Sequence, residues 1–114
     1  MQLKATSRVV GSIAVVDISG RITLGDGSAL LRKTVRGLLD EGRSHILLNL
    51  GDVDYIDSSG IGELVSGFST AKNRGGELKL LNLSRRVHDL LQLTKLYTVF
   101  DVYSDEATAL RSFG

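Results

Sequence analysis

The middle of the chain holds an almost unbroken apolar run, Ile46-Leu47-Leu48-Asn49-Leu50. A strand with one solvent-exposed face alternates apolar and polar side chains, whereas a strand covered on both faces does not. The run therefore predicts the central strand of a sheet that is covered on both faces. Packing must hold such a fold together, because the chain contains no cysteine and hence no disulfide.

Periodic segments on either side of this run predict the remaining elements. Two segments rich in β-branched residues are joined by Gly11-Ser12 and predict an opening hairpin. Later segments carry apolar residues at helical spacing or in short runs. In chain order we expect strands over 3–10 and 13–19, a helix containing 31–40, the strand over 46–50, a helix containing 61–71, a strand over 77–83, a short helix after an N-cap at Ser84, a strand over 98–103, and a terminal helix after an N-cap at Ser104.

This order, β-β-α-β-α-β-α-β-α, separates the later strands by crossovers long enough to return the chain parallel. We therefore expect an α/β fold, a small sandwich with a mixed, mostly parallel sheet of about four or five strands, opened by the hairpin and covered by about four helices. We expect a single domain over residues 1–114. Functional loops of such sheets lie beyond the carboxyl ends of the strands, which here means residues 21–27 and 51–57.

Composition removes several classes of partner. Fourteen Lys and Arg residues oppose thirteen Asp and Glu residues, so the net charge is +1 and no strong field gathers nucleic acid or anionic lipid. Three Tyr, three Phe and no Trp give few platforms on which bases could stack. No apolar stretch reaches the roughly 20 residues that span a bilayer, and the start of the chain lacks the apolar core of a signal peptide. We expect a cytoplasmic protein that contacts neither nucleic acid nor membrane.

Two hydroxyls and two glycines meet where a helix is expected to begin, in the block Asp57-Ser58-Ser59-Gly60-Ile61-Gly62. A helix N-terminus has free N–H groups and a partial positive charge, so it accommodates an anion such as a phosphoryl group on a neighbouring serine. The glycines expose the backbone to another surface. The same residues are also typical of a plain N-cap, which contributes about 1 kcal/mol and implies no function.

The block has a specific context, because His45-Ile46-Leu47-Leu48-Asn49-Leu50 precedes it and Gly75-Gly76-Glu77-Leu78 follows it. With these flanks the chain resembles, over nearly its whole length, the anti-sigma factor antagonists of the STAS domain family. The resemblance implies a small protein without catalysis or cofactor of its own. Its serine after the motif aspartate, Ser58 here, would be phosphorylated by an anti-sigma factor with serine kinase activity. The unphosphorylated form would bind that anti-sigma factor and release its sigma factor, phosphorylation would block binding, and a serine phosphatase would reverse it.

The partner-binding surface is expected at the serine block, the first turns of the second long helix and the loop after residue 22. The expected residues are Thr23, Leu24, Asp26, Asp57, Ser58, Ser59, Gly60, Ile61, Gly62 and Glu63. Ser59 is the rival phosphoacceptor, although the role of helix cap suits it better. Thr23 could hydrogen-bond to the Ser58 loop or be an ordinary turn residue. Arg21 could pair with a phosphate on Ser58 or remain a solvated charge.

Other functions lack their motifs. Neither serine of the block lies in the G-x-S-x-G sequence of a serine hydrolase, and the chain has no Walker A loop. The carboxylates of Asp52, Asp54 and Asp57 are expected to be solvated rather than to hold a metal. We therefore expect no enzyme and no metal site. The alternative that the sequence leaves open is a STAS scaffold subunit without a phosphate cycle, in a signalling or lipid-transport complex.

Overall fold

The computed structural model describes residues 3–113, and the expected domain of 1–114 extends beyond them by residues 1–2 and 114. The described residues form a five-stranded sheet in the order β1-β2-β3-β4-β5, in which β1 and β2 are antiparallel and all later pairs are parallel. The predicted fold class is thereby confirmed. The elements are β1 (Lys4–Val10), β2 (Ile13–Ile22), α1 (Asp26–Asp40), β3 (His45–Ile56), α2 (Ser58–Asn73), β4 (Glu77–Leu81), α3 (Arg85–Leu93), β5 (Val102–Tyr103) and α4 (Glu106–Ser112).

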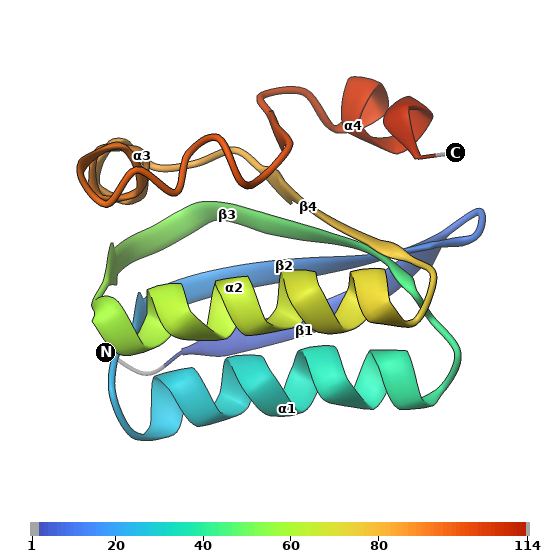
Figure 1. The fold of residues 1–114 in the computed structure, drawn as a ribbon, viewed down its shortest axis with the longest axis horizontal. Coiled ribbons are helices and arrows are strands. Elements are labelled where there is room, and N and C mark those ends of the chain that lie inside the picture. The colour runs from blue at the N-terminus through green and yellow to red at the C-terminus, as the bar shows by residue number, and fades with distance from the viewer. Residues whose placement is uncertain (1–2, 114) are drawn as a thin grey trace.

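β3 is the central strand, as its apolar run predicts, because it pairs with β2 on one side and with β4 on the other. Its side chains alternate between two apolar clusters. Ile46 and Leu48 belong to the cluster that includes α1 and α2, whereas Leu47 packs in a second cluster with Ala109 of α4. Figure 1 shows the resulting layers, with α1 and α2 on one side of the sheet and α3 and α4 on the other.

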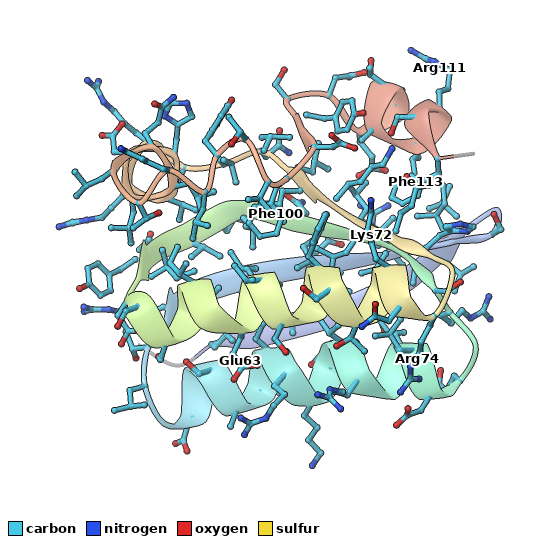
Figure 2. The ribbon with its side chains drawn as sticks, viewed as in Figure 1. Glu63, Lys72, Arg74, Phe100, Arg111 and Phe113 are labelled. Atoms are coloured by element: carbon cyan, nitrogen blue, oxygen red, sulfur yellow. The ribbon has the colours of Figure 1, made fainter. Side chains whose placement is uncertain are left out.

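The two long helices lie side by side and cover one face of the sheet (Figure 1). Ion pairs connect their outer sides, Arg32 to Glu63 at 3.2 Å and Arg74 to Asp40 at 2.9 Å. Figure 2 labels Glu63 and Arg74. Exposed pairs of this kind contribute little to stability, so the apolar stripe that each helix turns inward holds them in place. The buried side chains of these stripes are Leu31, Val35 and Leu39 on α1 and Ile61, Leu64 and Ala71 on α2.

The prediction of an acidic loop over 51–57 is wrong except at Asp57. β3 continues through this segment to Ile56, because β2 also runs past its predicted end and stays paired, with two register shifts, as far as Ile22. In the added stretch Val53 is buried, while Asp52 and Asp54 are exposed. Alternation of this kind is typical of a half-buried strand. The connection between β2 and α1 consequently shrinks to residues 23–25.

The chain after β4 is less regular than predicted. The strand expected over 77–83 ends at Leu81, and the strand expected over 98–103 is reduced to Val102 and Tyr103. The turns before β5 bury Phe100, which Figure 2 labels, against Phe68 of α2, with 5.4 Å between the ring centroids. Residues 98–100 of the expected strand are therefore turns, and Phe100 contributes to the core from them.

The caps of the two short helices differ in how well the sequence predicts them. Ser84 caps α3 by accepting the N–H of Val87, as predicted. At α4 the cap is Asp105, which accepts the N–H of Thr108. The prediction that Ser104 caps this helix is therefore wrong, because the helix begins one residue later than the sequence pattern indicates.

Candidate functional site

The start of α2 lies tightly against the end of β2. The backbone N–H of Asp57 donates to the carbonyl oxygen of Ile22 at 3.1 Å. A Cβ at position 60 would lie 2.5 Å from Cγ1 of Ile56 and 2.7 Å from the carbonyl oxygen of Ile22. Both neighbours belong to buried strand ends that cannot move aside easily. Gly60 is therefore required by packing, and this part of the serine block has a structural role.

The carboxylate of Asp57 organises the junction. Its Oδ1 accepts hydrogen bonds from the Gly60 N–H at 3.0 Å and the Ser59 hydroxyl at 2.5 Å, and its Oδ2 accepts one from the Leu24 N–H at 2.9 Å. The first of these bonds is the N-cap of α2. The Ser59 hydroxyl, assisted by the backbone N–H groups, lowers the pKa of Asp57 below its ordinary value, and partial desolvation opposes them. The ionised carboxylate thus holds the β2–α1 loop onto the start of α2.

Ser59 is turned inward toward α1. Its hydroxyl lies 2.7 Å from the Ser28 hydroxyl, and Ser28 in turn donates to the carbonyl oxygen of Thr23 at 3.0 Å. The prediction that Ser59 caps α2 is wrong, because Asp57 is the cap and Ser59 is one of its donors. Within residues 3–113, Thr23 takes part through its carbonyl oxygen alone, as an ordinary turn residue. The contact with the serine block comes instead from the Leu24 N–H and from Ser28.

Ser58 has the opposite environment. It is the first residue of α2 and its side chain is exposed. None of the side-chain hydrogen bonds between described residues involves its hydroxyl, whereas the neighbouring hydroxyl of Ser59 contacts both Asp57 and Ser28. Of the two candidate phosphoacceptors, Ser58 is therefore the one whose oxygen is free to react with a group from outside.

The predicted site residues lie on the β2–α1 connection and on the first turns of α2, which the Leu24–Asp57 hydrogen bond joins, and they lie at different depths. Leu24 is 81% exposed, and Asp26 and Gly62 are also at the surface. A Cβ at Gly62 would have nothing within 4 Å, so packing within the described chain does not require this glycine. Gly60 and Ile61 are buried and shape the surface from below. Glu63 is half-buried and paired with Arg32 on α1.

Two clefts flank the site. One has a volume of about 460 Å³ and lies along the β2–α1 connection; its lining includes Arg21, Thr23, Leu24 and Asp26. The other has a volume of about 550 Å³ and separates the β3–α2 junction from α3; it is lined by Tyr55, Ile56, Asp57, Ser58, Arg86, Asp89, Leu90 and Leu93. Ser58 thus lies on the wall of a cleft whose other wall comes from α3.

Ser28, Arg86 and Leu93 are among the residues of this region that the sequence pattern does not predict. Ser28 is only 6% exposed and reaches the site from the first turn of α1. Arg86 and Leu93 reach it from α3, far along the chain. Leu93 had a detectable signal, because it lies two residues after the buried Leu91 and so cannot share its helix face. In the structure Leu93 is 80% exposed.

The described residues provide neither a metal cluster nor a membrane span. Within residues 3–113, His, Asp and Glu side chains do not gather in groups of three that could hold a metal ion. Among the helices of the same range, none is long and apolar enough to cross a bilayer.

Comparisons with known proteins agree with this architecture. The family model described as STAS domain matches residues 4–109. The anti-sigma-B factor antagonist of Bacillus subtilis (strain 168) is 38% identical over 87 residues, which is 76% of this chain and 78% of that protein. The anti-sigma F factor antagonist of Paenibacillus polymyxa is 24% identical over 98 residues, which is 86% of this chain and 84% of that protein.

Solved structures share the fold at low sequence identity. A crystal structure of an anti-sigma factor antagonist from Mycobacterium paratuberculosis superposes with a TM-score of 0.87 at 17% identity, over 98% of this chain and 94% of that one. The anti-sigma factor antagonist SpoIIAA has been solved unphosphorylated and phosphorylated, with TM-scores to this chain of 0.72 and 0.74, both at 19% identity. These matches cover 95% of this chain, and 96% and 97% of the respective SpoIIAA chains. The chain therefore belongs to the STAS domain family, together with proteins that are named anti-sigma factor antagonists.

Proposed function

We propose that this chain is an anti-sigma factor antagonist whose activity is switched by phosphorylation of Ser58. The observation that carries the proposal is the contrast between the two neighbouring serines. The Ser58 hydroxyl is exposed and unengaged among the described residues, whereas Ser59 is bound to the carboxylate that caps α2. The unphosphorylated form binds an anti-sigma factor with serine kinase activity and releases its sigma factor, and a serine phosphatase restores that form.

The docking surface has apolar anchors on both sides of the phosphoacceptor. Leu24 lies in the β2–α1 loop, Leu93 lies at the end of α3, and both are about four-fifths exposed, at 81% and 80%. Large exposed apolar side chains near the centre of a surface are typical of residues that dominate binding energy. Gly62 supports the same assignment, because an exposed glycine inside a helix weakens the helix and lets a partner approach the backbone.

The phosphoryl transfer needs chemistry that the partner supplies. The Ser58 oxygen forms a bond to the γ-phosphorus of ATP, the bond from that phosphorus to the oxygen of ADP breaks, and the hydroxyl proton passes to a base of the kinase or to solvent. Asp57 is unsuited to be that base, because its oxygens already accept bonds from Ser59, Gly60 and Leu24. This chain therefore acts as the substrate of the kinase and is not itself an enzyme.

Phosphorylation blocks docking through charge rather than refolding. A phosphoserine carries about −1.5 to −2 charges at neutral pH, and it would join the carboxylates of Asp54 and Asp57 at the β3–α2 junction. Desolvating that charge against a partner is costly. SpoIIAA matches the fold of this chain about equally well in its unphosphorylated and phosphorylated forms, with TM-scores of 0.72 and 0.74, which supports a switch without global rearrangement.

Binding measurements on substituted chains test this function. The unmodified protein is first used to isolate its anti-sigma factor from the cells that produce it, and Kd is then measured by calorimetry. We expect Ser58→Asp to weaken binding by about 100-fold, equivalent to about 2.7 kcal/mol, and Ser58→Ala to bind like the unmodified chain. Incubation with the partner and ATP should place phosphate on Ser58 by mass spectrometry.

Two results would contradict the switch. Phosphate on Ser59 would move the acceptor by one residue, and tight binding by Ser58→Asp would remove the regulatory role of the site. Isolation of a transporter or a multi-subunit complex whose binding ignores both substitutions would favour the alternative, a scaffold subunit without a phosphate cycle.

A further inference from the structure

The cleft between α3 and the start of α2 contains both the phosphoacceptor and an arginine. Its walls include Ser58 from α2 and Arg86 and Leu93 from α3, within a volume of about 550 Å³. Such a volume is more than a phosphoryl group needs, so a group added to the Ser58 hydroxyl can extend into the cleft without displacing either helix. A charged side chain on the opposite wall of the cleft, such as that of Arg86, would then act on the added group.

Arg86 is oriented by an aromatic ring while its hydrogen-bonding groups stay available. Its guanidinium carbon lies 5.3 Å from the ring centroid of Tyr55, a cation–π distance. Tyr55 is the penultimate residue of β3 and is half-buried, so it offers a firm support. Between residues 3 and 113 the guanidinium of Arg86 makes neither a side-chain hydrogen bond nor an ion pair within 4.0 Å, whereas its neighbour Arg85 lies 4.0 Å from Asp89.

Arg21 contacts the same ring but lines the other cleft. Its guanidinium carbon is 4.9 Å from the Tyr55 centroid, yet Arg21 lines the cleft along the β2–α1 connection and not the one that contains Ser58. The sequence suggests Arg21 as the arginine that could pair with a phosphate. The tertiary structure favours Arg86, which comes from a helix that begins 27 residues after Ser58.

We propose that Arg86 binds the phosphoryl group of phosphorylated Ser58 across this cleft. The inference rests on the proposed function, because it needs phosphate at that position. A guanidinium donates two parallel N–H bonds to phosphate oxygens, which makes arginine the side chain best suited to hold this group. The bound phosphate then occupies the cleft beside Leu93, so phosphorylation removes part of the apolar docking surface as well as adding charge.

Two carboxylates face the same cleft and oppose the added charge. Asp57 is fully engaged by its three donors. Asp89 is exposed and lies 4.0 Å from Arg85 and 3.5 Å from His88. Arg86 and Asp89 should therefore act on the phosphate with opposite signs, and this difference allows a direct measurement.

The test is a titration of the phosphate itself. Phosphoserine is installed at position 58 of the full chain by suppressor-tRNA incorporation, without any kinase, and its second pKa is followed by ³¹P NMR. Pairing with a cation stabilises the dianion and holds this pKa below its ordinary value of about 6. We expect Arg86→Gln to raise it by about half a unit and Asp89→Asn to lower it by a similar amount. Arg85→Gln, the same charge change on a side chain that is 95% exposed, should change it little.

Equal pKa values in Arg86→Gln and Arg85→Gln would overturn the inference. Arg86→Lys provides a second measurement, because it keeps the charge and loses the two-pronged donor, and its pKa should fall between those of the parent and Arg86→Gln. The same phosphoprotein separates this inference from the proposed function. If it still binds the anti-sigma factor tightly, the switch fails; if binding is lost while the two arginine variants titrate alike, the switch stands and the role of Arg86 fails.

Discussion

The carboxylates of Asp57 and Asp17 both have a pKa below the ordinary value, but different kinds of partner lower it. Asp57, at the start of α2, accepts bonds from the Ser59 hydroxyl and from two backbone N–H groups. Asp17, on β2, pairs with the guanidinium of Arg8 at 2.8 Å and also accepts a bond from Asn49 at 2.8 Å. The first set of donors is neutral, and the second is dominated by a full positive charge.

The residues around Asp57 and those around Asp17 consequently have different structural roles. Arg8 also binds Glu106, so the Asp17 cluster connects β1, β2, β3 and α4, and the one guanidinium charge is shared between two carboxylates. The neutral donors around Asp57 fix a loop and a helix start but leave the negative charge of the carboxylate in place. A surface ordered in this way is rigid and still sensitive to further charge, which suits a site that phosphate is proposed to switch. The Asp17 cluster suits the attachment of a helix.

The largest expected effect comes from the close packing at the start of α2, next to the Asp57 cluster. In Gly60→Ala the new Cβ would meet Ile56 at 2.5 Å and the carbonyl oxygen of Ile22 at 2.7 Å. We expect a loss of about 3 kcal/mol in the free energy of unfolding, measured by urea titration. Gly62→Ala is the matched control, because nothing lies within 4 Å of its Cβ, and it should gain about 0.5–1 kcal/mol. Equal stability of the two variants would show that the close packing at Gly60 is dispensable.

The second-largest effect is expected when the carboxylate of Asp57, which accepts the three hydrogen bonds, is removed. Asp57→Ala loses the N-cap of α2 and the bond that ties the Leu24 loop to it. We expect a cost of about 2 kcal/mol in the free energy of unfolding. Amide exchange should rise in the β2–α1 loop, while amides around Asp17 and α4 stay protected. A uniform rise in exchange across the sheet would contradict the local role assigned to Asp57.

The smallest effect is expected when one donor is removed from each carboxylate, and the pKa values of Asp57 and Asp17 are then compared. Both carboxylates have folded pKa values below the unfolded value of about 3.9. Their stabilisation is therefore present above that pH and is lost as the pH falls through the folded pKa. Ser59→Ala should raise the pKa of Asp57 alone and cost about 1 kcal/mol, whereas Arg8→Met should raise the pKa of Asp17 alone of the two. NMR titration of the side-chain carboxyl carbons measures both, and a shift of both groups in either variant would contradict the separation.

The local pattern was sufficient for most of the architecture. The apolar run at 46–50 predicts a central strand with both faces covered, and the spacing of Leu31 and Val35 predicts the buried stripe of α1. The pattern failed where Asp and Gly residues are frequent. Residues 51–56 continue β3 because a neighbouring strand pairs with them, and no property of the segment alone shows that partner.

The candidate site was also predictable from the sequence only in part. The block at 57–62 marks the beginning of α2, but the roles of its residues depend on contacts from other elements. Ser59 donates to Asp57 and reaches Ser28 on α1, which leaves Asp57 as the cap and Ser58 at the surface. Arg86 and Leu93 join the site because α3 packs beside the end of β3.

The amino-acid sequence alone determined the order and type of the main elements and the position of the serine block, because helical and strand periodicity are local properties of neighbouring residues. Only the tertiary structure decided which serine hydroxyl is free and which arginine shares its cleft. Those outcomes depend on competition among donors, acceptors and charges from segments far apart in the chain, and the fold sets which of them meet.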